Sequence, residues 1–448
     1  MRVNKPDSVG TLKRLLVGLL PILLVACSGG PSSSGSTPTT TPTTPTPAPP
    51  PAIVNTTSIV MDAGPAALQI GANAYSAFNE PYVTITICAP GSTTNCQTID
   101  HIILDTGSVG LRIIQPVLTS SLLAALPVET SATGNGVGEC YQYVNSYAFG
   151  SVRQADFQIA GEKVTNIPFQ TIGDTGSYTS IPATCSAGGG TPIKTVQDFG
   201  ANGIIGIGTT ATDCGTICAA GNSSAAIYYD CPSSGCSGII SRASSATAPF
   251  QQLPNPVAAF PQDNNGTIIA LPAVPQAGLA SVTGTVTFGI GTQSDNALSA
   301  PNILALTTST SRLGPGLLSA AYNGKALTQS FLDSGSQEYF FIDTSLPGCT
   351  QAAFIAFYCP TSPLSLSPLI TAIDGTTASG AFLLYNPNNA NATATVAPGL
   401  GVNPTLVTPP LPFANSFDFG VPFFYGKSVY TAIEGRSAGG RQGPYVAF

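Results

Sequence analysis

The stretch IILDTGS at residues 102–108 is echoed by SFLDSGS at residues 330–336. In both stretches an apolar run ends in Asp, which is followed by Thr or Ser, then Gly and Ser. Apolar residues resume soon after each stretch, as VGLRII at 109–114 and YFFI at 339–342. This pattern predicts a strand, a tight turn and a second strand, formed twice in one chain. We therefore expect two related halves that each contribute one aspartate.

The composition favours strands over helices. Hydrophobic residues make up 43% of the 448 residues and charged residues only 8%, whereas an average soluble domain has about 25% charged residues. Long helices need Lys and Glu on their solvated faces, while 48 Gly and 39 Pro suit short strands joined by turns. Apolar and polar residues alternate at 82–87, 285–288 and 428–433, as in strands. The expected fold class is all-β.

Charge and histidine content exclude several kinds of site. With 14 basic and 21 acidic residues the formal net charge is −7, so the chain lacks the basic surface that nucleic-acid binding requires. Its single histidine, His101, excludes sites built from several imidazoles. We interpret His101 as a surface residue at the head of a strand. We expect no cofactor, no metal and no nucleic-acid partner.

Two aspartates in buried turns suit acid and base chemistry on water. Two carboxylates in one cleft cannot both ionise cheaply, so they share a proton and act as an acid and a base. The hydroxyl residue after each Asp can fix the turn, the glycine permits close approach, and the last serine can donate to the carboxylate. The candidate catalytic residues are Asp105 and Asp333. The candidate supporting residues are Thr106, Gly107, Ser108, Ser334, Gly335 and Ser336.

Two other charged residues, Asp174 and Arg112, are not predicted to be catalytic. A third DTGS lies at 174–177, but the residues before and after it do not read as two buried strands. We therefore predict that Asp174 is a loop residue. Arg112, just after the first motif, reads as a solvated strand residue, and the alternative is a subsite that prefers acidic side chains.

The layout resembles the pepsin-like aspartic peptidases, in which each of two β lobes provides one catalytic Asp. The resemblance covers nearly all of residues 75–448. GIIGIG at 203–208 and FDFGVPFF at 417–424 resemble the apolar strand ending in Gly that passes beside each catalytic loop in this family. Asp418 places a charge in the second of these strands. The resemblance implies a bilobal double β-barrel and an aspartic endopeptidase that hydrolyses peptide bonds in a peptide or protein substrate, without a cofactor.

The same resemblance implies a flap, a β-hairpin that carries a Tyr over the substrate. Counting back from Gly150 places Tyr143 at this position, with Tyr141 and Tyr147 as nearby alternatives. The two residues after Tyr143 are not the glycines usual in the family, and the chain has no Trp to support the tyrosine. The second hypothesis is therefore a catalytically inactive pepsin-like envelope lipoprotein that binds a peptide or glycan ligand.

The first 52 residues predict export and anchoring. Basic residues precede an apolar run at 15–25, which is too short to span a membrane and is typical of a signal-peptide core. LVAC at 24–27 resembles the bacterial lipobox, so we expect that residues 1–26 are removed and Cys27 is lipidated; an ordinary secretory signal is the alternative. Residues 27–52 are rich in Ser, Thr and Pro and predict a disordered tether. Because Ser and not Asp follows the cysteine, the expected location is the outer membrane of the bacterial cell envelope.

Beyond the lipobox cysteine, ten cysteines remain, and an even number in an exported chain predicts five disulfides. The close pairs Cys88/Cys96 and Cys349/Cys359 each predict a local loop. A group of four allows three connectivities or, alternatively, a zinc site. Its members are Cys214, Cys218, Cys231 and Cys236.

After the tether we divide the chain into an N-terminal β lobe at 53–280 and a C-terminal β lobe at 281–448. The boundary rests on GTVTFG at 284–289, which resembles the start of the C-terminal lobe in the pepsin-like family. We expect the protein to be a monomer.

Overall fold

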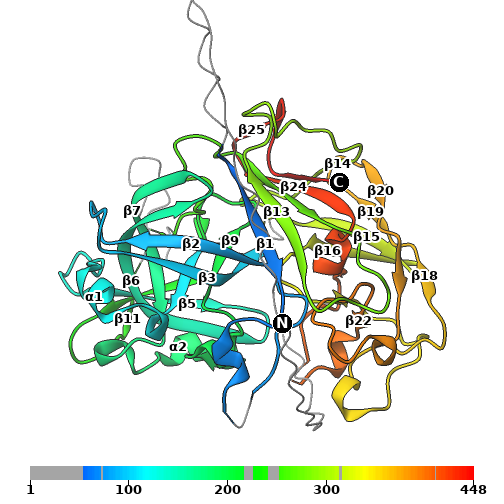
Figure 1. The fold of residues 1–448 in the computed structure, drawn as a ribbon, viewed down its shortest axis with the longest axis horizontal. Coiled ribbons are helices and arrows are strands. Elements are labelled where there is room, and N and C mark those ends of the chain that lie inside the picture. Colours follow the sequence, from blue (N-terminus) through cyan, green and yellow to red (C-terminus); the bar gives the residue numbers. More distant parts are fainter. Residues whose placement is uncertain (1–53, 72–73, 216–225, 241–251, 312–314, 409) are drawn as a thin grey trace, which may run out of the picture. The chain divides into compact units, whose positions relative to one another are not determined.

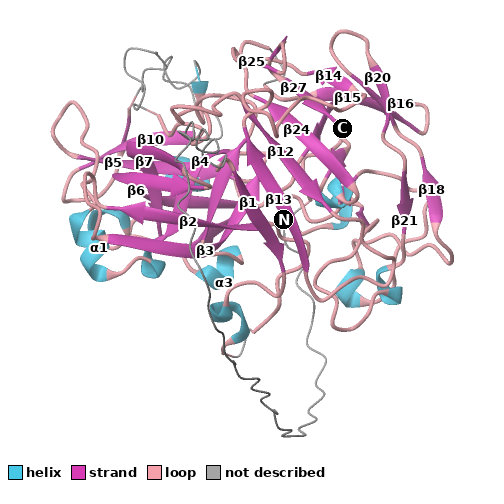
Figure 2. Cartoon of the chain, turned by 45° about the horizontal axis from the view of Figure 1, so that its top comes forward, coloured by secondary structure: helices cyan, strands magenta, loops and turns pink. Residues whose placement is uncertain are grey.

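The computed structural model describes residues 54–71, 74–215, 226–240, 252–311, 315–408 and 410–448. Strands dominate this part of the chain, and the helices among them are short (Figures 1 and 2). The α-helices are α1 (Ser120–Ala125), α2 (Ala183–Ser186) and α3 (Val196–Phe199). The 3₁₀ helices are η1 (Ala66–Gln69), η2 (Gln115–Val117), η3 (Gly176–Tyr178), η4 (Ala352–Phe354), η5 (Pro387–Asn389), η6 (Pro404–Leu406) and η7 (Val421–Phe424). The predicted all-β class is confirmed.

The first half of the chain builds most of one sixteen-stranded sheet. Its strands are β1 (Thr56–Met61), β2 (Tyr82–Cys88), β3 (Cys96–Asp105), β4 (Val109–Ile114), β5 (Gly136–Gln142), β6 (Ser146–Ile159), β7 (Glu162–Ile172), β8 (Thr191–Ile193), β9 (Gly203–Ile207), β10 (Ala226–Cys231) and β11 (Gly238–Ile239). Because β6 pairs with both β7 and β2, six strands close into a ring in the order β6, β7, β4, β9, β3 and β2. This ring lies in the blue-to-green half of Figure 1.

The same sheet continues beyond β1 into strands from the second half of the chain. These are β12 (Gly266–Leu271), β13 (Val282–Phe288), β14 (Ile303–Ala305), β24 (Lys427–Ala432) and β27 (Tyr445–Ala447). The order beyond β1 is β13, β12, β24, β27 and β14, so residues from both ends of the described chain share one sheet (Figure 2). The strands predicted at 82–87, 285–288 and 428–433 correspond to β2, β13 and β24 and are confirmed.

A second sheet of seven strands belongs wholly to the second half. It is formed by β15 (Leu318–Tyr322), β16 (Lys325–Leu332), β17 (Tyr339–Phe340), β19 (Leu369–Thr371), β20 (Thr377–Ser379), β22 (Gly401–Val402) and β23 (Asp418–Phe419). Two small sheets pair β18 (Leu364–Leu366) with β21 (Phe382–Leu384) and β25 (Ser437–Ala438) with β26 (Arg441–Gln442). The largest cluster of buried apolar side chains takes members from both halves, among them Leu104 and Leu332, the residues directly before the two aspartates.

Each half contains the same unusual connection. β3 and β4 are joined by the first Asp turn but do not pair with each other, because β9 lies between them, parallel to β3 and antiparallel to β4. β16 and β17 flank β23 with the same two orientations. The two Gly-ending segments singled out in the sequence therefore do run beside the two Asp turns.

The described disulfides are Cys88–Cys96, Cys140–Cys185, Cys231–Cys236 and Cys349–Cys359. Both predicted local loops are among them. In the group of four, the Cys231–Cys236 bond removes two of the thiolates that the alternative zinc site would need. Cys214 is also disulfide-bonded, and Cys218 lies outside the described residues.

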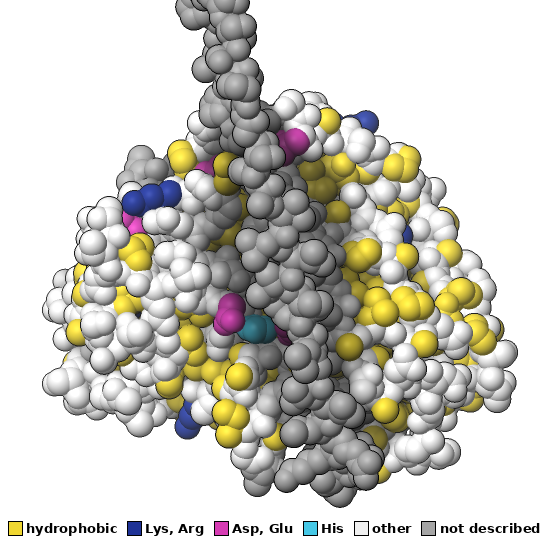
Figure 3. All heavy atoms as spheres, in the orientation of Figure 1, with side chains coloured by type: hydrophobic (Ala, Val, Ile, Leu, Met, Phe, Trp, Pro, Cys, Tyr) yellow, Lys and Arg dark blue, Asp and Glu magenta, His cyan; other side chains and the backbone are white. Residues whose placement is uncertain are grey.

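The predicted signal peptide, Cys27 and the tether lie outside the described residues. None of the described helices is long and apolar enough to cross a membrane. On the face drawn in Figure 3, uncharged side chains predominate and Lys and Arg are few, as the composition requires.

Candidate active site

The two aspartates come together at the ends of equivalent strands. Asp105 is the last residue of β3, and Asp333 directly follows β16. A Cβ atom on Gly107 would lie 2.6 Å from Oδ1 of Asp333, and a Cβ atom on Gly335 would lie 2.6 Å from Oδ1 of Asp105. Because no side chain fits at either place, only glycine allows the two loops to approach this closely.

Each carboxylate is held by its own turn in the same way. The amide of Gly107 donates to Oδ1 of Asp105 at 2.7 Å, and the amide of the glycine in the second loop donates to Oδ1 of Asp333 at 2.8 Å. The hydroxyl of Ser108 donates to Oδ2 of Asp105, and the hydroxyl of Ser336 donates to Oδ2 of Asp333 at 2.8 Å. Each Oδ1 atom thus accepts from its own loop and lies close to the glycine of the opposite loop, and each Oδ2 atom accepts a hydrogen bond from a serine.

The residues after the two aspartates bind the loops to each other. The amide of Thr106 donates to Oγ of Ser334 at 3.0 Å, and the amide of Ser334 donates to Oγ1 of Thr106 at 2.9 Å. The Ser334 hydroxyl also donates to the carbonyl of Leu104 at 2.7 Å. Both side chains are buried, so these hydrogen bonds are shielded from water and fix the relative position of the two loops.

The electrostatics of the pair favour a shared proton. Asp105 is buried, and burial is the largest cause that raises its pKa well above the ordinary value; the charge of Asp333 and a hydrogen bond with that carboxyl raise it further. The hydrogen bonds from Ser108 and Gly107 oppose this shift without cancelling it. Two carboxyl groups in hydrogen-bond contact titrate as a unit and retain one proton after the other has left.

Tyr143 lies directly after β5, at the turn that leads into β6. Its ring centroid is 5.0 Å from that of Tyr141 and 5.8 Å from that of Phe199. Its hydroxyl is buried and has no hydrogen-bond partner among the described residues, and burial raises its pKa. The hairpin tip that the sequence pointed to therefore carries a tyrosine whose ring is packed and whose hydroxyl is unused.

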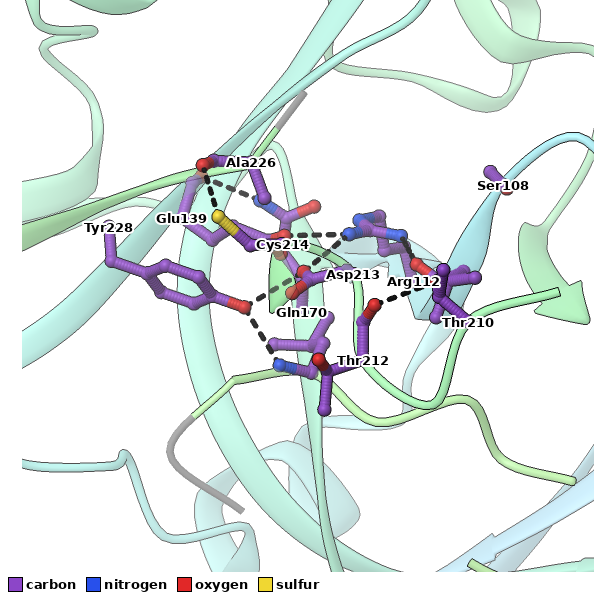
Figure 4. Close-up of polar contacts among 12 residues, drawn as sticks. Ser108, Arg112, Glu139, Gln170, Thr210, Thr212, Asp213, Cys214, Ala226 and Tyr228 are labelled. Carbon is purple, nitrogen blue, oxygen red and sulfur yellow. Dashed lines mark hydrogen bonds and ion pairs between the residues drawn. The ribbon is translucent and has the colours of Figure 1, made fainter. Parts of the chain in front are cut away.

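The prediction that Arg112 is solvated is wrong. Its side chain is fully buried, with Nη2 2.6 Å from Oε1 of Glu139 and 3.1 Å from Oδ2 of Asp213 (Figure 4). The guanidinium also lies over the ring of Tyr141, 3.6 Å from its centroid. Local sequence does not reveal this burial, because the two acids lie 27 and 101 residues away along the chain. The subsite alternative also fails, because both available acids already bind the guanidinium.

The two acids beside Arg112 form a second carboxyl pair. Burial raises the pKa of Asp213 well above its usual range, and the charge of Glu139 and a hydrogen bond with it raise the pKa further, whereas Arg112 lowers it. Tyr228 donates to Oδ2 of Asp213 at 2.8 Å, and Gln170 donates to the carbonyl of Glu139 at 2.6 Å. The Arg112 guanidinium supplies the counter-charge that these buried carboxyl groups require.

The structure confirms the prediction for Asp174 and corrects the one for His101. Asp174 lies in a loop, as predicted, separated from the buried end of β7 by Gly173, and its side chain is buried and accepts hydrogen bonds from the amide of Ser151 and the hydroxyl of Thr171. Its role is to fix that loop. His101 lies inside β3 and not at its head, with Nε2 3.3 Å from the carboxylate of Asp62.

Asp418 lies near the pair of Asp105 and Asp333, called the dyad below. The sequence alone suggested no role for Asp418. Its side chain is fully buried on β23, and neither carboxylate oxygen has a hydrogen-bond partner among the described residues. The hydroxyl of Ser336 donates to Oδ2 of Asp333 at 2.8 Å and is also close enough to Asp418 to act on its carboxyl group. Burial raises the pKa of Asp418 well above its usual range, and the charge of Asp333 raises it further, whereas Ser336 lowers it. The signal in the sequence is a single charge in an otherwise apolar run.

Across the residues that the structure describes, no cluster of three or more His, Cys, Asp or Glu could hold a metal ion. Asp105 and Asp333 are two adjacent carboxyl groups on loops that are hydrogen-bonded to each other, and Gly107 of the first loop is exposed to solvent. Such a pair can take a proton from a water molecule and give one to a carbonyl oxygen.

Residues 52–448 match the sequence model of one protein family, whose description is "Protein of unknown function (DUF3443)". Among curated proteins, none matches the chain. Among solved structures, the chain is similar to the crystal structure of an aspartic proteinase from Irpex lacteus, with 14% sequence identity and a TM-score of 0.45. That similarity covers 87% of this chain and 97% of the other.

Proposed function

The chain belongs to the family described as protein of unknown function DUF3443, and for this member we propose aspartic endopeptidase activity carried by Asp105 and Asp333. The observation that supports the proposal is the reciprocal contact of the two Asp loops. Each aspartate faces the glycine of the opposite loop, and the two carboxyl groups share a hydrogen bond. Neither loop alone could form such a pair, since each supplies only one carboxyl group.

In the proposed reaction, a water molecule binds between the two carboxyl groups. One aspartate accepts a proton from this water while the other donates its proton to the oxygen of the scissile carbonyl, which gives a neutral tetrahedral diol. As the diol collapses and the C–N bond breaks, the aspartate that took the proton from water gives it to the amine, and a diol hydroxyl returns a proton to the other aspartate. Ser108 and Ser336 support the ionised form of each aspartate, because a hydroxyl that donates to a carboxylate stabilises its charge.

Peptide cleavage by the purified residues 54–448, compared with the variants Asp105→Asn and Asp333→Asn, tests the proposal. Each variant keeps the size of the side chain and removes the acid, so kcat should fall by about 10⁴-fold or more, as when a member of a catalytic unit is lost. A peptide with a statine in place of the scissile residue should inhibit the unchanged protein. Asp174→Asn, which alters the third DTGS, is the matched control and should keep its activity. Cleavage that persists in either dyad variant rejects the assignment.

The second candidate is a binding protein that holds a peptide or glycan in the same cleft without cutting it. The buried, unpartnered hydroxyl of Tyr143 favours this candidate, because a flap tyrosine packed in this way is not available to a substrate. Tight binding of the statine peptide, together with no cleavage of any peptide between pH 3 and pH 8, would select this function.

We also propose that the protein is a monomer held at the outer membrane through lipidated Cys27. The support is the sequence alone, namely the apolar run followed by LVAC at 24–27. The test is mass spectrometry of the mature N-terminus together with membrane fractionation of the full chain and of Cys27→Ser. An acylated Cys27 and release of the variant from the membrane are expected. A mature chain that begins elsewhere would refute the anchor.

A further inference from the structure

The strands beside the two aspartates are in the same register. Asp105 pairs with Gly206 on β9. The amide of Asp333 donates to the carbonyl of Phe419 on β23 at 3.0 Å, directly before Gly420. Gly206 and Gly420 therefore occupy equivalent places, which allows the neighbouring residues of the two strands to be compared one by one.

Ile204 and Asp418 each lie two residues before their glycine. Side chains two residues apart on a strand point to the same face of the sheet, so Asp418 lies on the face that carries Asp333, as Ile204 lies on the face that carries Asp105. The charges of Asp333 and Asp105 both act on the Asp418 carboxyl group. Asp418 is therefore a third carboxyl group on the dyad side of the sheet.

The surroundings of Asp418 supply no counter-charge. It pairs with Phe331 on β16 and with Phe340 on β17, and both of these residues belong to or pack on one apolar cluster. None of the ion pairs among the described residues involves Asp418. A buried carboxyl group without hydrogen bonds or a cation is costly, and such groups concentrate at binding and catalytic sites.

We propose that Asp418 is a specificity-determining residue that binds a cationic side chain, Lys or Arg, of a substrate residue next to the scissile peptide bond. This inference rests on the proposed function in that it concerns the same cleft. The bound cation supplies the missing counter-charge in a site of low dielectric, where a close ion pair is stronger than in water. Apolar side chains around Asp418 match the aliphatic stem of Lys or Arg.

Binding of the cation requires Asp418 to lose its proton. The titratable groups that act on it are Asp333 and Asp105, both acidic, and they oppose this loss. A cationic substrate therefore displaces one proton when it binds, whereas a neutral substrate displaces none. The preference for a cationic substrate should accordingly increase with pH for as long as the dyad keeps its shared proton.

The test uses pairs of peptides that differ only in Lys or norleucine, placed on one side or the other of the cleaved bond. For the unchanged protein at pH 6, kcat/KM should favour Lys about tenfold or more at one of the two positions, and the ratio should be smaller at pH 4. Asp418→Asn, which keeps the shape, and Asp418→Ile, which copies Ile204 of the first half, should both lower the ratio to about one. Asp374→Asn removes an exposed carboxylate and should leave the ratio of kcat/KM for the two peptides unchanged. Circular dichroism and thermal melting verify that each variant is folded.

Binding measurements with non-cleavable statine peptides carrying Lys or norleucine separate this inference from the proposed function. If no peptide is cut but Kd still favours Lys and the preference is lost in Asp418→Asn, the peptidase proposal fails and the cation site stands. If peptides are cut with no preference for Lys, or if Asp418→Asn keeps the preference, the cation site is refuted. If neither peptide is bound or cut, both proposals fail.

Discussion

The two aspartate loops have the same backbone hydrogen bonds, but the strands beside them carry their charged residue at different places. Seven residues after the first aspartate lies Arg112, which pairs with Ile204 on β9. Seven residues after the second lies Phe340, which pairs with Asp418 on β23. Each half therefore has one charged and one apolar residue in this pair, and the two kinds of residue have exchanged strands.

The difference lies in how each charge is compensated. The guanidinium of Arg112 binds two acids and an aromatic ring, so the charge in the first half is fully paired within the protein. The carboxyl group of Asp418 has no partner among the described residues. The hydrogen bonds that hold the two aspartates are therefore common to both halves, whereas the flanking charge is paired within the protein only in the first half.

Replacing the charged residue of the first half should give the largest loss of stability. Arg112→Met leaves Glu139 and Asp213 buried without their cation, so the free energy of unfolding should fall by about 3–5 kcal/mol. The matched change Phe340→Leu in the second half should cost only about 1–2 kcal/mol, because it removes packing and leaves no charge unpaired. Urea denaturation measures both. Equal costs would show that the Arg112 cluster is not a charge cluster in solution.

The cross-loop hydrogen bonds should behave as one unit shared by the two halves. Thr106→Val and Ser334→Ala each leave a buried amide without its acceptor, so each should lower the free energy of unfolding by about 1–3 kcal/mol. The double variant should cost less than the sum of the two by at least about 0.5 kcal/mol, because the two hydrogen bonds join the same pair of loops and the first loss already loosens the second. Costs that simply add would mean that the two loops are held independently.

The buried acid Glu338 of the second half should make the protein less stable as pH rises. Burial raises the pKa of Glu338 from the ordinary value of 4.5 to about 8. The folded state therefore holds a proton that the unfolded state has lost in this interval, and stability should fall between pH 4.5 and 8, by up to about 1.4 kcal/mol per pH unit for one proton. Glu338→Gln should reduce this slope.

The control for this experiment is Asp374→Asn, because the pKa of Asp374 is lowered and its carboxylate is exposed. For this variant, the free energy of unfolding should change with pH between 4.5 and 8 as steeply as it does for the unchanged protein. A Glu338→Gln variant with an unchanged slope would place the pH dependence in other groups.

The smallest effect is expected at the hairpin tip of the first half. Tyr143→Phe removes a hydroxyl that has no partner among the described residues and keeps the packed ring, so stability should change by no more than about 0.5 kcal/mol. Thermal melting of the two proteins side by side measures it. A loss well above this would show that the hydroxyl binds a partner and that the hairpin tip is held by more than ring packing.

Local patterns in the sequence were sufficient for the repeated elements. The low charge and the alternation of apolar and polar residues indicated an all-β fold. Alternation can be read from the sequence because it involves only residues that are adjacent in the chain. The two Asp turns and the two strands that end in Gly206 and Gly420 could be recognised for the same reason, since each is a short motif with its own backbone requirement. The two local disulfide loops followed from close spacing.

Only the tertiary structure decided which charges are buried and what they meet. The sequence shows Arg112 in an apolar strand but not Glu139 and Asp213, which reach it from distant segments. It shows a charge at Asp418 but not the absence of a partner. The reason is physical: the desolvation and Coulomb energies of a buried group depend on distances in space, and the separation of residues along the chain does not determine those distances.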